Sequence, residues 1–330
     1  MRKFLRIAAV VSSLTIFVGA CSGTPNDGST KAGGQTDSNK QLFVGVSNQG
    51  LSVTFPAAIG RGIEDQAKKL GVKVVQLDAK FDAAKQASDV QDLLTQNPDG
   101  ILMIPVNAAS SANLVTKIAA TSIPVASVHG VVGADRKPKD VYPELNFLYN
   151  EDEVAAGGEA GKLALKALPN GGKVAIIEGQ AGFAEVALRA QDFKSTIEKA
   201  GNFQIVANQP GNWTLEQGQA ACQNILSAHP DLGLFYAESD DMAVGCTKAI
   251  AAAKSRAQVI GIGGSKTGID AIKSGEMFGT VCYTPYSEGV AAMNDFYKVL
   301  KGENKEKARF ITYPTPAITK ANVDQCVPQW

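Results

Sequence analysis

Two histidines, a pair of adjacent aspartates and a glycine-rich segment are the parts of this sequence that could carry out chemistry. His129 directly follows an apolar run at 124–128 that predicts a buried strand, whereas His229 precedes Pro230 in a predicted turn. Catalysis by histidine needs a nucleophile or a second acid–base group within hydrogen-bonding reach. Neither histidine has such a partner at the spacing of a known motif. We therefore expect His129 to contact a ligand and not to act as a catalyst.

The other two features are also explained without catalysis. Segment 261–268 is rich in glycine, but it has neither the spacing of a phosphate-binding loop nor the third glycine of a dinucleotide-binding fingerprint. We interpret it as a tight turn from a strand to a helix. Asp240 and Asp241 are adjacent, so their side chains point apart, and we predict that they cap the helix that follows. The sequence predicts a protein that is not an enzyme and that needs neither a cofactor nor a metal.

The elements that must position these residues alternate between strands and helices, which predicts an α/β fold with parallel sheets covered by helices on both faces. Strands are predicted at 42–46, 72–77, 101–105, 124–128, 173–177, 203–207, 232–236 and 258–262, and helices at 59–70, 85–96, 111–121, 153–168, 184–200, 215–228 and 242–253. The pattern stops in a polar stretch at 133–144 and restarts near residue 150, which indicates two sheets. Ligands of such folds bind at the carboxyl ends of the strands, so we expect a ligand cleft between two lobes.

Composition limits the class of protein. The 330 residues include 32 basic and 32 acidic side chains, and 45% are hydrophobic. Removing the first twenty residues, which hold Arg2, Lys3 and Arg6 but no acid, leaves 29 basic against 32 acidic side chains, a net charge of −3. A mildly acidic chain of this composition is not a disordered protein and does not bind nucleic acid through a basic face.

The N-terminal residues have the features of an export signal. The chain begins with basic residues, and an apolar run follows at 7–20 that is too short to span a bilayer comfortably. Together these two features predict a signal peptide at 1–20. Val18-Gly19-Ala20-Cys21 resembles the bacterial lipobox, in which the cysteine is lipidated; the alternative is an ordinary signal peptide followed by an incidental cysteine. Residues 21–40 lack large apolar side chains and predict a flexible tether. We expect an exported protein anchored by lipid to the outer face of the cytoplasmic membrane.

The four remaining cysteines all lie in the C-terminal half, at 222, 246, 282 and 326, and no Cys-x-x-Cys motif occurs. An even number of cysteines in an exported protein suggests disulfides, and four cysteines allow three connectivities. We favour Cys222–Cys246, on consecutive predicted helices, and Cys282–Cys326, which would join the C-terminal segment to a strand. Four buried free thiols are the alternative.

Seven stretches in the same order along the chain resemble the ribose/galactose-type (type I) solute-binding proteins of bacterial ABC importers. They are GIEDQAKKLG at 62–71, DVQDLL at 89–94, PDGILMIPVN at 98–107, IPV at 123–125, AAG at 155–157, GKVAIIEG at 172–179 and SDDMAVG at 239–245. The resemblance covers nearly all of 41–328.

The resemblance implies two doubly wound parallel-sheet lobes joined by three crossing strands that form a hinge. The N-terminal lobe would hold residues 41–150 and 284–313, and the C-terminal lobe 151–283 and 314–330. Such proteins are monomers that close on a small molecule and dock on a membrane permease, which is coupled to ATPase subunits. Two other kinds of protein share this scaffold. One is a repressor, which needs a DNA-binding segment where we predict a signal peptide in this chain. The other is a lipoprotein that presents its ligand to a sensor kinase or chemoreceptor.

The resemblance also implies a ligand site. Phe55 matches an aromatic residue that covers a sugar ring, Arg189 an arginine that forks onto hydroxyls, and Trp213 a stacking aromatic. Four positions depart from the family pattern: His129, with Gly130, stands in place of an aspartate–arginine pair, Ser239 in place of an asparagine, Gly263 in place of an aspartate and Tyr283 in place of a glutamine. The expected ligand-binding residues are Asn48, Phe55, His129, Asp152, Arg189, Trp213, Ser239, Gly263 and Tyr283.

These departures leave two hypotheses for the ligand. The first is a small or less hydroxylated sugar or polyol, held by Arg189, His129 and Ser239 together with aromatic rings. The second is an anionic or aromatic metabolite, because the residues that match the family's acidic neighbours of Arg189 are absent, and the guanidinium would then be free to pair with a carboxylate.

Overall fold

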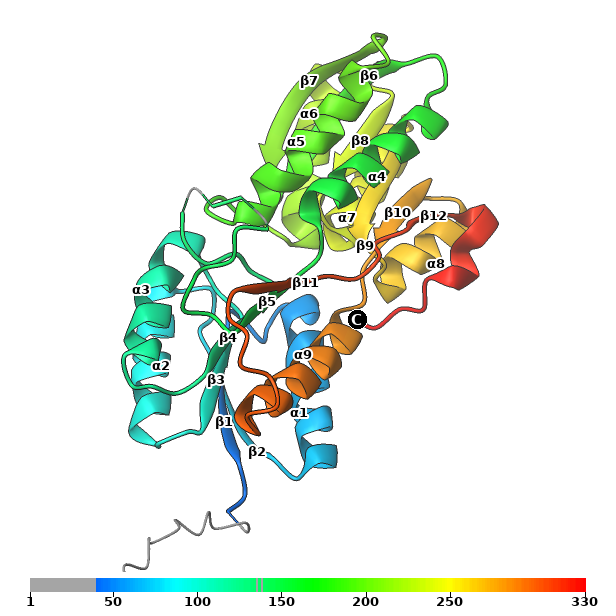
Figure 1. Ribbon diagram of the computed structural model, residues 1–330. Coiled ribbons are helices and arrows are strands. Elements are labelled where there is room, and N and C mark those ends of the chain that lie inside the picture. The colour runs from blue at the N-terminus through cyan, green and yellow to red at the C-terminus, as the bar shows by residue number, and fades with distance from the viewer. Residues whose placement is uncertain (1–39, 135, 138) are drawn as a thin grey trace, which may run out of the picture. The chain divides into compact units, whose positions relative to one another are not determined.

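A computed structural model describes residues 40–134, 136–137 and 139–330 (Figure 1). The predicted signal peptide at 1–20, the predicted lipidation site at Cys21 and the rest of the predicted tether up to residue 39 lie outside the described residues. Among the described residues, no helix is both long enough and apolar enough to cross a membrane.

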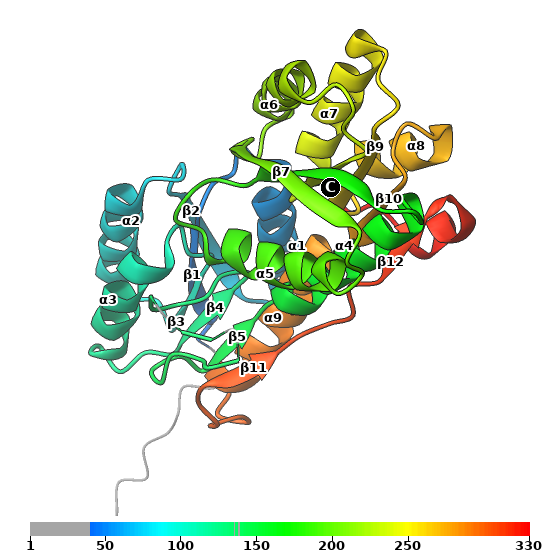
Figure 2. The same ribbon diagram turned by 90° about the horizontal axis from the view of Figure 1, so that it is seen from above.

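Strands from the first half of the described chain, joined by β11 from its C-terminal part, form a sheet of six strands in the order β11-β5-β4-β3-β1-β2, and all neighbours in it are parallel. The strands are β1 (Phe43–Asn48), β2 (Lys73–Asp78), β3 (Gly100–Met103), β4 (Val125–Val128), β5 (Phe147–Tyr149) and β11 (Arg309–Ile311). Helices α1 (Thr54–Leu70) and α9 (Pro285–Leu300) cover one face, and α2 (Ala83–Thr95) and α3 (Ala108–Ala119) cover the other (Figure 2).

Alternation of apolar side chains along the strands produces these two cores. On β3, Leu102 packs with α1 and α9, whereas Ile101 and Met103 face α2 and α3. Successive side chains of a strand point to opposite faces, so a strand that is apolar at every position must be covered on both sides. The layers therefore follow from the sequence of the strand itself.

The second sheet has the strand order β12-β10-β9-β8-β6-β7, and only β12 runs antiparallel to its neighbour β10. Its strands are β6 (Gly172–Glu178), β7 (Phe203–Pro210), β8 (Leu234–Ala237), β9 (Gln258–Gly263), β10 (Gly279–Cys282) and β12 (Ala317–Thr319). Helices α4 (Glu153–Ala167) and α5 (Ala184–Glu198) pack on one face, and α6 (Leu215–Ala228), α7 (Asp240–Ala253) and α8 (Lys266–Ser274) on the other. A short 3-10 helix, η1 (Lys320–Gln325), follows β12.

The prediction of an α/β fold with two parallel, helix-covered sheets is confirmed. The chain passes between the sheets three times, from β5 to α4, from β10 to α9 and from β11 to β12. All three passages are only a few residues long, and we refer to 150–152, 283–284 and 312–316 as the crossing segments. Residues at the carboxyl ends of β4, β8, β9 and β10 border a cavity beside the crossing segments.

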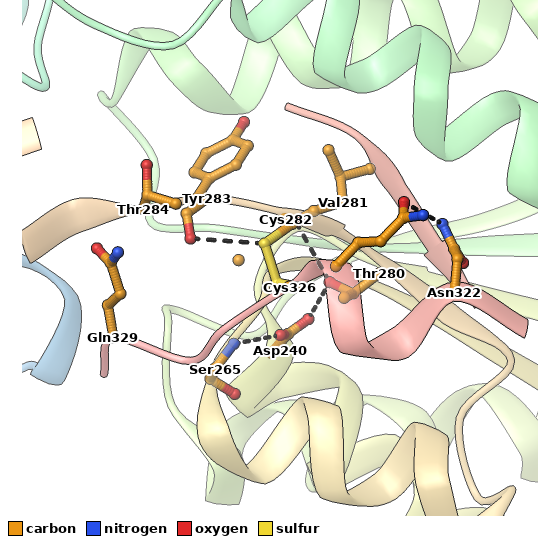
Figure 3. The surroundings of a disulfide bond; sticks show 12 residues. Asp240, Ser265, Thr280, Val281, Cys282, Tyr283, Thr284, Asn322, Cys326 and Gln329 are labelled. Carbon is orange, nitrogen blue, oxygen red and sulfur yellow. Dashed lines mark hydrogen bonds between the residues drawn. A yellow bond between two sulfur atoms is a disulfide. The ribbon is translucent and has the colours of Figure 1, made fainter. Parts of the chain in front are cut away.

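Two disulfides occur in the second half of the chain, with the pairings that the sequence favours. Cys222 of α6 is joined to Cys246 of α7, with the Cα atoms 5.3 Å apart. Cys282, the last residue of β10, is joined to Cys326 just after η1, at a Cα–Cα distance of 5.9 Å (Figure 3). The second disulfide holds the segment 326–330 beside the crossing segment 283–284.

Candidate ligand-binding site

A cavity with an empty volume of about 620 Å³, part of it open to solvent, is bordered by residues of both sheets and their loops. The first sheet and its loops contribute Gln49, Val53, Phe55, Pro56, Phe81 and His129; the second contributes Phe183, Glu185, Arg189, Trp213, Glu238, Ser239, Asp241, Ile262 and Gly263, with Tyr283 from a crossing segment and Trp330 from the C-terminal segment. Several of these residues follow directly on strands, as expected for a ligand at the carboxyl ends of parallel strands.

Aromatic rings make up much of the wall. Phe55, in the first turn of α1, lies edge-on to Trp330 with the ring centroids 5.2 Å apart. Phe183 lies edge-on to Trp213 at 6.0 Å and reaches toward Phe81 of the first lobe at 6.2 Å. Such rings offer flat apolar faces to a ligand at a low cost in conformational entropy.

Trp213 is held against the second sheet by a tight fit to Gly179. A Cβ atom on Gly179 would overlap the Trp213 ring. The loop that carries the ring bends through positive φ values at Asn212 (49°) and at Trp213 itself (64°). Strained backbone of this kind persists only where the surrounding structure fixes it, which is common at ligand sites.

Arg189, on α5, is fully engaged by a buried carboxylate. Its Nε donates to Glu153 Oε2 at 2.6 Å and its Nη2 to Glu153 Oε1 at 2.7 Å, while Nη1 donates to the backbone oxygen of Glu238 at 2.9 Å. Tyr283 donates to the same Glu153 at 2.5 Å. Burial lowers the pKa of Arg189, but Glu153 outweighs it and the pKa lies well above the ordinary value.

The expectation that Arg189 lacks acidic neighbours is therefore wrong. Its partner Glu153 is the first residue of α4 and comes from a helix adjacent to α5. Sequence comparison by motif overlooks this partner because it lies 36 residues away along the chain. An anion would have to compete with a two-bond fork from Glu153. The hypothesis of an anionic ligand at Arg189 loses its basis.

His129 is paired in the same way. Its Nδ1 lies 2.8 Å from Glu151 Oε2, and Tyr313 donates to the other oxygen of Glu151. Burial lowers the pKa of His129, but Glu151 raises it by more, so the pKa is above the usual value; the pKa of Glu151 is lowered in turn. Both shifts favour an imidazolium–carboxylate ion pair. The pair lies between β4 and two of the crossing segments.

His129, Glu151 and Glu153 each have one possible metal-ligating atom within 4.8 Å of the others. Both carboxylates are already engaged by His129, Arg189 and the tyrosines described above. The cluster is accounted for by these ion pairs.

Three acidic side chains of the lining have no ion-pair partner among the described residues: Glu185, Glu238 and Asp241. Glu238 follows β8, and its Oε2 accepts a hydrogen bond from the backbone N–H of Gly179 at 2.9 Å. Burial raises the pKa of Glu238 to about 8. Burial also raises the pKa values of Glu185 and Asp241.

Seven of the nine residues expected at the site line the cavity, and two do not. Asn48 lies at the end of β1, where it donates to Pro56 O at 2.9 Å and accepts from Gly50 N at 3.0 Å. It shapes the turn before α1. Asp152 accepts from Ala155 N at 3.2 Å as the N-cap of α4 and forms an ion pair with Lys139 at 3.1 Å.

The expected capping role of Asp240 and Asp241 is also wrong. The N-cap of α7 is Ser239, whose Oγ accepts from Met242 N at 3.3 Å. Asp240 is buried and accepts from Ser265 N at 2.8 Å and from Thr280 Oγ1 at 2.6 Å (Figure 3). It joins the start of α7 to β10 and to the turn before α8, while Asp241 faces the cavity.

Sequence reasoning missed several lining residues, among them Gln49, Phe183, Glu238 and Trp330. Glu238 could have been found, because it comes two residues after the end of the strand predicted at 232–236 and directly before Ser239. Trp330 reaches the cavity because the Cys282–Cys326 disulfide holds its segment in place. Its Nε1 donates to Gly263 O at 3.1 Å, and the preceding Gln329 binds Ser287 in α9 through both side-chain atoms.

Comparison with known proteins agrees with this fold and cavity. Residues 44–304 match the family described as periplasmic binding protein domain. The chain is 29% identical over 303 residues to the ribose import binding protein of Bacillus subtilis, covering 92% of this chain and 95% of that one. It is 27% identical to the xylitol-binding protein of Mycolicibacterium smegmatis, covering 93% and 86% of the two chains. The structure of the Caulobacter myo-inositol binding protein, with bound myo-inositol, superposes with a TM-score of 0.80 at 27% identity, covering 87% and 96%.

The chain belongs to the periplasmic binding protein family. It is a substrate-binding protein of the kind that serves ABC importers, it works outside the cytoplasm, and it is not an enzyme. The alternative of a protein that presents its ligand to a sensor kinase or chemoreceptor has no support among these relatives.

Proposed function

We propose that this protein captures a small sugar or polyol in the cavity and delivers it to the membrane permease of an ABC importer, which is coupled to ATPase subunits. The observation that carries the proposal is a cavity with aromatic walls and a few polar side chains, lined by residues of both sheets and by Tyr283 of one crossing segment. The relatives named for ribose, xylitol and myo-inositol support this class of ligand.

The chemistry of the lining suits hydroxylated rings or chains. Phe55, Trp213 and Trp330 would cover the C–H faces of the ligand, which bury apolar area. Carboxyl oxygens of Glu185, Glu238 and Asp241 and the amide of Gln49 would bind hydroxyl groups at the edges. Arg189 and His129, each held in an ion pair, would keep the polar wall in a fixed geometry.

Binding would close the two lobes. We assign residues 41–150 and 284–313 to the N-terminal lobe and 151–283 and 314–330 to the C-terminal lobe, with the three crossing segments as the hinge. A ligand that contacts both lobes stabilises the closed arrangement, and a permease that recognises this arrangement discriminates loaded from empty protein.

For the N-terminal residues we propose a signal peptide at 1–20 that is removed on export, lipidation of Cys21 and a flexible tether up to residue 40. The lipid would keep a monomeric binding protein at the outer face of the cytoplasmic membrane, next to the permease. Two disulfides in the folded part are consistent with an oxidising compartment. Mass spectrometry of the membrane fraction tests this: a diacylated N-terminal peptide beginning at Cys21 is expected, and an unmodified Cys21 would contradict it.

A thermal-shift panel of neutral sugars and polyols tests the proposed ligand class. A ligand present at a hundred times its Kd stabilises the protein by about 2.7 kcal/mol, a shift of several degrees. Trp213→Ala should remove the shift, whereas Trp213→Phe should keep part of it. No shift with any sugar or polyol, together with a shift for another class of metabolite, would overturn the proposal.

A further inference from the structure

The charges of the cavity lining are unbalanced. Its two basic side chains are both neutralised by buried carboxylates, Arg189 by Glu153 and His129 by Glu151. Glu185, Glu238 and Asp241 remain without a basic partner among residues 40–134, 136–137 and 139–330. Any charge that these three carboxyls contribute toward a ligand is therefore negative, and burial makes it depend on their ionisation.

Glu238 gives a second and independent sign of a missing partner. The side chain is fully buried, and although Oε2 is bound by Gly179 N, Oε1 has no hydrogen-bond partner within the described part of the chain. Buried polar atoms in native proteins are nearly always paired, and an orphan calls for an explanation such as a bound ligand. Glu238 lines the cavity but Oε1 is closed off from it, so a ligand donor pairs this atom once the side chain turns toward the ligand.

The rings around the cavity fit the same kind of ligand group. Phe55 lies edge-on to Trp330 with the centroids 5.2 Å apart, and Phe183 lies edge-on to Trp213 at 6.0 Å. A cation near such faces is attracted by the ring quadrupole, and the attraction is stronger where water is excluded. An aromatic wall with an unpaired buried carboxyl recognises a positive group better than a hydroxyl.

We propose that the natural ligand is an aminated sugar or polyol whose protonated amino group donates to Oε1 of Glu238, with Glu185 adding to the negative field. This inference rests on the proposed function and narrows it to one class of ligand. The ring or chain carbons of the ligand lie against the aromatic wall, and its hydroxyl groups bind the remaining polar side chains. Burial that keeps the pKa of Glu238 near 8 in the empty cavity is offset when the cation binds, so that this carboxyl then ionises.

Isothermal titration calorimetry at pH 7 on the purified full chain tests the inference with matched pairs: glucose and glucosamine, sorbitol and glucamine, myo-inositol and an inosamine. For the pair that fits the cavity, we expect the amine to bind at least about tenfold more tightly than its neutral counterpart. Glu238→Gln should remove most of this preference and change the affinity for the neutral compound less than about threefold. Glu198→Gln, at the exposed end of α5, is the control and should change neither.

Each other outcome overturns the inference. Equal or tighter binding of the neutral members would refute the amine while leaving the proposed sugar or polyol function intact. If neither member of any pair binds, the result would count against both the amine and the proposed sugar or polyol function. If Glu238→Gln loses the same factor of affinity for the amine and for its neutral counterpart, the carboxyl has no role in recognising charge. If Glu238→Gln does not fold, Glu185→Gln is measured in its place, and an unchanged amine preference in that variant refutes the inference.

Discussion

Replacing Arg189 by methionine distinguishes two roles for this residue: partner in a structural ion pair, or direct contact of the ligand. Methionine is close to arginine in length and fills much of the same volume without a charge. The substitution removes two hydrogen bonds to Glu153 and one to the Glu238 backbone. It leaves Glu153 buried, with only the Tyr283 hydroxyl as a partner.

The expected loss of stability follows from that unpaired carboxylate. Breaking a buried ion pair by removing one partner typically costs about 3–5 kcal/mol. At roughly 2 °C per kcal/mol for a chain of this size, the melting temperature should fall by about 6–10 °C. Adding Glu153→Gln to Arg189→Met removes the uncompensated charge and should recover most of the loss.

Urea unfolding of the wild type, both single variants and the double variant gives the coupling energy of the pair. We expect about 2–3 kcal/mol of coupling. A coupling energy near zero, with Arg189→Met as stable as the wild type, would refute the reasoning. Arg189 would then be free to bind ligand anions.

Three further predictions follow from the site and the disulfides. The pKa of Glu238 is higher in the folded protein than in the unfolded chain, so the free energy of unfolding should fall as pH rises from about 4.5 to 8, by at most about 5 kcal/mol. Denaturation measured across this range should show a weaker pH dependence of stability in Glu238→Gln, and the same pH dependence in both proteins would contradict this. Loss of Cys282–Cys326 through paired serine substitutions should cost about 4 kcal/mol, from its sequence separation of 44 residues, and unchanged unfolding would show that the bond does not constrain the chain. Gly179→Ala should displace the Trp213 ring and weaken ligand binding at least about tenfold in a titration, whereas an unchanged affinity would mean that the ring is not a ligand contact.

The regular part of the fold could be predicted because its signals are local. Runs such as 101–105 and 259–262 have few or no polar side chains, which identifies strands that are covered on both faces. The strands β5, β11 and β12 were not predicted, since each has only three residues and owes its conformation to neighbouring strands. Helix α9, at 285–300, was also missed, although it carries a helical apolar face.

The site was predictable only where it coincides with a family motif or a strand end. Phe55, Trp213 and Tyr283 were identified in this way and do line the cavity. Asn48 and Asp152 also lie at element ends, but they satisfy backbone groups of their own turns, which sequence position alone does not reveal. The partnership of Arg189 with Glu153 depends on how α4 packs on α5, and no local pattern encodes it.

The two tryptophans of the sequence provide the most direct test of a ligand in this cavity. Both Trp213 and Trp330 line it, so a bound ligand must change their surroundings. Intrinsic tryptophan fluorescence of the full chain is titrated with neutral and aminated sugars and polyols. We predict a saturable change in intensity or emission maximum for at least one compound, and a reduced change in both Trp213→Phe and Trp330→Phe. A compound that binds by calorimetry without changing the emission of either tryptophan would contradict the account.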